Sequence, residues 1–228
     1  MARFLKFLIG LLLLPGCVAI TRTLVHLVLA LRPAAAGDLT APACGFIIGF
    51  VFWIVLFFIL PPPVRAYVLA HELTHALWGL ALGARVRRLK TSSQGGSVTL
   101  SKNNFLITLA PYFFPLYTFL VFLLYYALSY FFSLRAYEPF WLGLLGLTWA
   151  FHLTFTISTL RLRQPDIQAQ GRVFSWALIY FVNLLVLSLW IVFAARPTLR
   201  QFALLFSQDL IESWSGVCAL SRRLLHLL

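Results

Sequence analysis

Charged side chains are scarce in this chain. Only 11% of its 228 residues are charged, whereas 61% are hydrophobic; a soluble domain carries about 25% charged residues. So few charges cannot cover a water-soluble surface, which excludes an ordinary soluble protein. We therefore expect one multi-pass bundle of membrane helices, surrounded by the lipid bilayer.

Acidic side chains are rarer still, with six against 18 lysines and arginines. The basic residues fall mostly between apolar stretches, which is typical of membrane proteins whose loops meet anionic lipid headgroups. This placement argues against a nucleic-acid partner. Glu72 lies within an apolar helical stretch and Asp166 in a short linker between two such stretches. An ionisable group at membrane depth is costly, so both are candidate functional residues.

Cysteine is also rare. The three cysteines, Cys17, Cys44 and Cys218, are far apart and match no Cys-x-x-Cys spacing. Their odd number excludes a fully paired disulfide framework. The stretch Leu14-Pro15-Gly16-Cys17 loosely resembles a lipoprotein cleavage box, but apolar residues resume over 24–31. We therefore expect a first membrane segment there and not a removed signal.

Long apolar stretches dominate what remains. A membrane helix needs about 20 mostly apolar residues, and the candidate segments are 7–31, 43–60, 66–83, 105–132, 139–160 and 173–195. Residues 1–197 are predicted to form an all-α transmembrane helix bundle of about five to six membrane segments. In residues 198–228, polar residues interrupt apolar ones at helical spacing. This pattern predicts a C-terminal amphipathic surface helix, with a last membrane span as the alternative.

Residues 85–101 have a different pattern. Polar and apolar residues alternate on both sides of Gln94-Gly95-Gly96, a sequence typical of a turn. The alternation predicts a short β-hairpin. Its edge could bind an extended peptide by adding a strand, or the hairpin could be a plain connection; the sequence leaves both open.

His71, Glu72 and His75 form the pattern His-Glu-x-x-His inside an apolar stretch. Residues four apart lie on one helix face, so both imidazoles can reach one ion. Glu72 is rotated to the side, where its carboxylate can reach a metal-bound water. Burying these three groups in an apolar helix is expensive without a metal. The pattern therefore favours a zinc site over two core histidines and a surface glutamate.

A catalytic zinc needs a third protein ligand and an open position for water. Asp166 is the favoured candidate, because it enters from the side toward which the motif helix runs. Pro165 breaks the helix next to it and leaves backbone groups that require a polar lining. His152, within an apolar segment, is the less favoured candidate.

These features resemble the site-2 protease family of intramembrane zinc metalloproteases, and their order and spacing are similar to its smaller bacterial members. The resemblance rests on His-Glu-Leu-Thr-His at 71–75, the glycine-containing hairpin that follows, and Pro-Asp at 165–166, and covers roughly residues 64–190. It implies His71, His75 and Asp166 as zinc ligands, Glu72 as the residue that activates water, and a bacterial cell membrane as the location. The setting of Asp166 departs from the family's Asn-Pro-x-x-x-Leu-Asp-Gly-like pattern.

The expected function is hydrolysis of peptide bonds in a membrane-embedded substrate, a transmembrane helix, by a zinc-bound water that Glu72 activates. The main alternative is a catalytically inactive metal-binding membrane protein that binds or regulates a partner. Two less favoured functions are a protease of the type that trims prenylated proteins, whose third ligand would be Glu138 or Glu212, and an ion transporter that uses histidine and aspartate.

Overall fold

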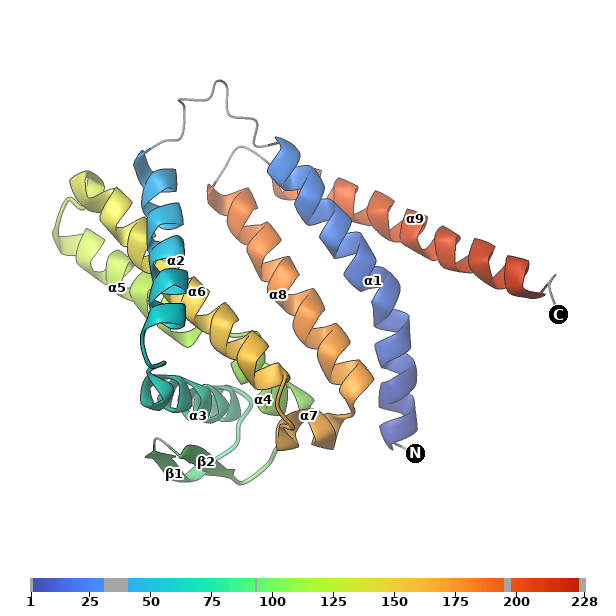
Figure 1. Ribbon diagram of the computed structural model, residues 1–228, viewed down its shortest axis with the longest axis horizontal. Helices are drawn as coiled ribbons and strands as arrows, with labels where there is room; N and C mark the ends of the chain where they lie inside the picture. The colour runs from blue at the N-terminus through green and yellow to red at the C-terminus, as the bar shows by residue number, and fades with distance from the viewer. Residues whose placement is uncertain (1, 31–40, 93, 195–197, 226–228) are drawn as a thin grey trace. The chain divides into compact units, whose positions relative to one another are not determined.

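The computed structural model describes residues 2–30, 41–92, 94–194 and 198–225, and these are mostly helical (Figure 1). The elements form two compact units. One unit contains α1 (Ala2–Ala30), α8 (Arg172–Ala194) and α9 (Leu199–Leu225), and the other runs from α2 to Asp166. The mostly helical class is confirmed. The predicted boundary between residues 197 and 198 adjoins residues 195–197, which lie outside the described residues.

The second unit contains all four candidate site residues. Its elements are α2 (Ala41–Ile59), α3 (Val64–Ala81), β1 (Val86–Ser92), β2 (Gly95–Leu100), α4 (Phe105–Leu109), η1 (Ala110–Tyr112), α5 (Leu116–Phe131), η2 (Arg135–Tyr137) and α6 (Glu138–Leu160). Strands β1 and β2 pair antiparallel, so the predicted β-hairpin is confirmed. Helix α7 (Pro165–Gln170) begins next to Asp166, the last residue of this unit.

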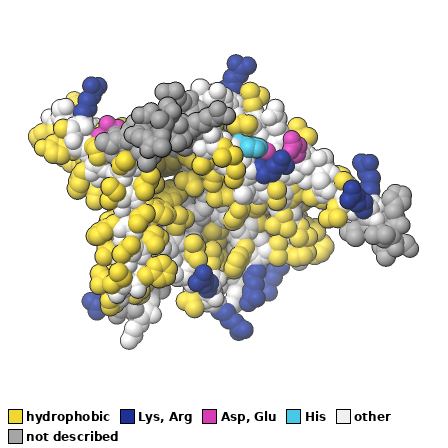
Figure 2. Space-filling view, turned by 45° about the horizontal axis from the view of Figure 1, so that its top comes forward, with side chains coloured by type: hydrophobic (Ala, Val, Ile, Leu, Met, Phe, Trp, Pro, Cys, Tyr) yellow, Lys and Arg dark blue, Asp and Glu magenta, His cyan; other side chains and the backbone are white. Residues whose placement is uncertain are grey.

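Three helical stretches are long and apolar enough to cross a membrane, namely Arg3–Ala30, Arg135–Leu160 and Arg172–Val192. Two bent helix pairs meet the same criterion, which gives up to five spans in the part of the chain that the structure describes. The prediction of five to six segments is thus confirmed only in part. Figure 2 shows hydrophobic side chains over most of the visible surface, and Tyr130 and Phe58 are 85% and 80% exposed. Such a surface is that of a membrane protein.

Prolines cause both bends. Pro61-Pro62-Pro63 separate α2 from α3, and the chain bends by 120° between the two helices. Since proline has no N–H and a fixed φ, a run of three ends one helix and lets another start in a new direction. Segments 43–60 and 66–83 are therefore the two arms of one bent pair. The segment 105–132, predicted as one span, is bent by 80° next to Pro115.

Helix α2 lies against α6 at backbone contact. A Cβ atom on Gly49 would overlap the backbone of Gly143, and one on Gly146 would overlap the backbone of α2. Small residues allow membrane helices to approach this closely. The adjoining apolar core consists of four buried side chains, Trp53, Ala150, Phe151 and Phe155. This packing holds α6 in place beside the bend that leads into α3.

In the other unit, α1 packs against α8 and α9. Its core contains four buried side chains, Ile20, Leu27, Val192 and Phe202. The buried Asp209 of α9 accepts a hydrogen bond from the Thr23 hydroxyl at 2.8 Å and lies 3.5 Å from Nε of Arg22. The predicted helix within residues 198–228 is confirmed; its location on a membrane surface stays a prediction.

The close contact of α2 and α6 predicts that Gly49→Ala destabilises the protein, because the added methyl group forces the helices apart. Overpacking of this kind costs about 1–3 kcal/mol, which should appear as a lower thermal unfolding temperature in detergent. The control is Gly216→Ala in α9, where a Cβ atom meets nothing within 4 Å and alanine favours the helix. Equal unfolding temperatures for the two variants would contradict the packing.

Candidate metal centre

Helix α3 carries two of the three candidate ligands. His71 and His75 lie one turn apart, with ring centroids 4.9 Å apart and ring planes at 81°. His75 is buried and His71 is partly buried. Both imidazoles therefore lie on the same face of α3, as the spacing predicted.

Asp166 comes from a different segment and meets both histidines. Its Oδ2 atom lies 3.5 Å from Nε2 of His71 and 3.4 Å from Nε2 of His75. One ligand atom from each of the three residues lies within 4.8 Å of the others. The structure thus brings together the three residues that the sequence analysis named as ligands.

The other ring nitrogens of the two histidines have partners of their own. Nδ1 of His75 lies 2.8 Å from the carbonyl oxygen of Ile107, and Nδ1 of His71 lies 3.2 Å from the hydroxyl of Tyr67. Thr159 donates in turn to the Tyr67 oxygen at 2.9 Å. When Nδ1 carries the proton and donates to such an acceptor, Nε2 keeps a free lone pair. The carbonyl partner fixes this tautomer for His75, and the Tyr67 hydroxyl, which can donate or accept, is compatible with it for His71.

The donor set suits zinc. Zinc bonds to imidazole nitrogen and carboxylate oxygen are about 2.0–2.2 Å long, so neighbouring donors around a tetrahedral ion lie about 3.3–3.5 Å apart. Two of the three donor pairs, from Asp166 Oδ2 to the histidine Nε2 atoms, lie 3.5 and 3.4 Å apart and fall in this range, and all three donors lie within 4.8 Å of one another. Three protein ligands leave one tetrahedral position for water, which is the arrangement of a catalytic site.

The two histidines favour the ionised form of Asp166 by lowering its pKa. Burial raises the pKa of its carboxyl group, but hydrogen bonds with His71 and His75 outweigh this effect and hold the pKa below its ordinary value. A carboxylate can bind a cation without first losing a proton.

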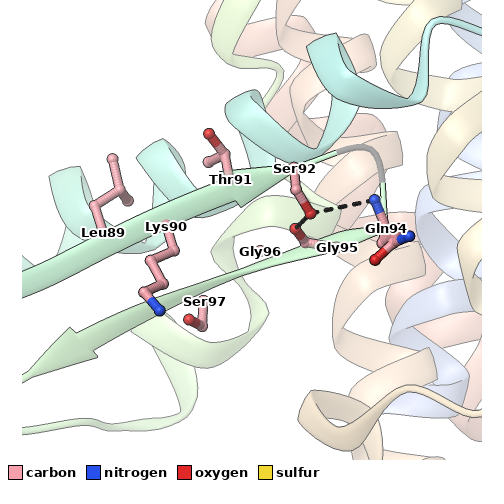
Figure 3. Close-up of a pocket in the computed structure, with 8 residues that line it drawn as sticks. All are labelled: Leu89, Lys90, Thr91, Ser92, Gln94, Gly95, Gly96 and Ser97. Atoms are coloured by element: carbon pink, nitrogen blue, oxygen red, sulfur yellow. Dashed lines mark hydrogen bonds between the residues drawn. The ribbon is translucent and has the colours of Figure 1, made fainter.

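Glu72 lies beside the ligands and under the hairpin. Its side chain is buried, and a Cβ atom on Gly96 of β2 would lie 2.5 Å from Cγ of Glu72 and 2.8 Å from Cγ1 of Val68. Only glycine lets the strand backbone approach the glutamate this closely. Figure 3 shows Gly96 next to the hairpin end, where the Ser92 hydroxyl donates to the Gly95 carbonyl at 2.8 Å. Gly96 was predicted to lie in a turn, and its contact with Glu72 was not predicted from the sequence.

A small cavity of about 20 Å³ adjoins His71. Its polar lining includes Tyr67, Thr74, Thr148 and His152. A cavity needs about 10–15 Å³ to hold a water molecule, so this one has room for a water next to the cluster. His152, the less favoured third ligand, lines this cavity and is not a member of the three-residue donor group.

No protein-family model matches the chain, and neither a curated protein nor a solved structure matches it.

The geometry predicts about one zinc ion per chain in protein purified without chelator, measured by elemental analysis. His75→Ala and Asp166→Ala should each lose the ion, because two ligands hold zinc far more weakly than three. Glu72→Gln should keep it. The control is Glu138→Gln, which changes an exposed acid at the start of α6. Zinc that survives both ligand substitutions would contradict this assignment.

Proposed function

We propose that the chain is an intramembrane zinc metalloprotease similar to the site-2 protease family. The observation that carries the proposal is the meeting of His71, His75 and Asp166 donor atoms within 4.8 Å, beside the buried carboxylate of Glu72. A structural zinc site is normally closed by four protein ligands, whereas three ligands and a nearby glutamate are typical of zinc hydrolases.

His71, His75 and Asp166 would hold the zinc. When bound, zinc supplies a Lewis acid that lowers the pKa of water toward about 7 and polarises a carbonyl oxygen. Glu72 accepts the proton from the attacking water as the new bond from oxygen to the peptide carbon forms. It then gives this proton to the amine nitrogen as the carbon–nitrogen bond breaks. The Ile107 carbonyl, which can only accept, keeps the proton of His75 on Nδ1 and leaves its Nε2 free for the metal.

The substrate would be a transmembrane helix. The helices around the site are those of a membrane protein, so a substrate that reaches the site laterally arrives within the bilayer. A helical backbone hides its carbonyl groups in hydrogen bonds, so the substrate must unwind locally before it is cut. An extended segment of this kind can pair with a free strand edge, and β2 approaches Glu72 through Gly96.

Glu72→Gln tests the protease function. Losing a general base lowers the rate about 10²–10⁴-fold, while zinc content should stay at the wild-type level. The assay follows cleavage of single-span reporter peptides, with glycine or proline at their centre, reconstituted with the protein in lipid vesicles. Cleavage that is unchanged in Glu72→Gln, or a zinc-loaded wild-type protein that cuts none of the reporters, would favour the catalytically inactive alternative.

Gly96→Ala tests whether the strand backbone holds Glu72 in place. The added methyl group must displace the Glu72 side chain or the strand, and misplacing a catalytic group by about 1 Å can cost about 10²-fold in rate. We expect cleavage to fall at least about tenfold while zinc content is unchanged. The exposed neighbour Ser97 provides the control, Ser97→Ala. Equal cleavage rates for the two variants would show that β2 does not set the position of the base.

A further inference from the structure

One short segment contacts two of the three candidate ligands. It consists of α4 and η1, residues Phe105–Tyr112, and its residues Leu109, Ala110 and Tyr112 are fully buried. From this segment, the Ile107 carbonyl meets Nδ1 of His75 at 2.8 Å. The Tyr112 hydroxyl donates to Oδ2 of Asp166 at 3.2 Å.

A proline leaves the Ile107 carbonyl available for His75. In a regular α-helix this carbonyl would accept from the N–H four residues later, but that residue is Pro111, which has no N–H. The N–H of Ile107 is also engaged, because it donates to Oδ1 of Asn104 at 2.9 Å. The backbone of Ile107 is thus fixed, with its carbonyl directed to His75.

Tyr112 contacts the carboxylate of Asp166 and the ring of His71. Its ring lies edge-on to His71, with centroids 5.3 Å apart and planes at 86°. A fully buried hydroxyl needs an acceptor, because leaving it unpaired costs about 1–3 kcal/mol. Asp166 belongs to the short helix α7, and the Tyr112 hydroxyl adds a third polar contact to its Oδ2 atom, beside those of the two histidines. The hydroxyl therefore selects one orientation of the ligand oxygen.

We propose that Phe105–Tyr112 is the positioning element of the metal centre, and that Tyr112 is a positioning residue that holds Asp166 in its ligand orientation. This proposal rests on the metal centre of the proposed function. It assigns the binding strength of the site to a segment that supplies none of the ligands. Partners of metal ligands typically contribute 10–100-fold to metal affinity.

The test compares Tyr112→Phe with Tyr117→Phe in detergent-solubilised protein. Both variants remove one buried or half-buried hydroxyl, but that of Tyr117 donates to the Ala66 carbonyl and not to a ligand. The zinc dissociation constant is measured by competition with a chromophoric chelator. Tyr112→Phe should raise the zinc dissociation constant about 10–100-fold. Tyr117→Phe should leave this constant within about threefold of the wild-type value, because it removes no partner of a metal ligand.

Cobalt(II), bound in place of zinc, gives a visible absorption spectrum that a structural change away from the metal would not alter. The visible absorption of bound cobalt depends on the geometry of its ligands, so Tyr112→Phe should alter the spectrum, while Tyr117→Phe should not. Thermal unfolding of both metal-free variants checks that their folds are comparable. Equal zinc affinities and identical cobalt spectra for the two variants would overturn the role of Tyr112 and leave the protease function standing. A wild-type protein that binds no zinc would overturn both.

Discussion

Two imidazoles and one carboxylate converge within an apolar helical unit, where His75 is buried and His71 and Asp166 are partly buried. Taking a carboxylate out of water costs several kcal/mol unless it is paired. Asp166 is paired with two histidine nitrogens and the Tyr112 hydroxyl. A divalent cation at the same point would neutralise the carboxylate further and use the lone pairs of both imidazoles. Pairing this carboxylate requires three separate segments to meet, namely α3, α4–η1 and the start of α7.

Each of these segments lies next to a proline. Pro63 precedes α3, Pro111 lies in η1, and Pro165 begins α7. Long uninterrupted membrane helices satisfy their own backbone groups and run past one another. Proline ends or bends them and frees backbone carbonyls, such as that of Ile107. The breaks therefore change the directions of the helices, so that they meet at the centre. They also supply the hydrogen-bond acceptors that a polar centre in a membrane protein needs.

Local patterns in the sequence predicted much of this structure. The spacing of His71 and His75 predicted their common helix face, alternation predicted the hairpin, and the scarcity of acids pointed to Asp166.

Tyr67 could have been found, since it lies four residues before His71 on the same face. The 120° bend between α2 and α3, the Ile107 carbonyl and the approach of Gly96 to Glu72 could not. They depend on contacts between segments distant in the chain, which helical or strand periodicity does not encode. Zinc, proteolysis and the membrane substrate remain proposals.

X-ray absorption at the zinc edge of the purified, zinc-loaded protein tests whether His71 and His75 both bind the metal. We expect nitrogen and oxygen neighbours at about 2.0–2.2 Å, with outer-shell scattering from two imidazole rings. A spectrum without imidazole scattering, or with sulfur neighbours at about 2.3 Å, would contradict this expectation.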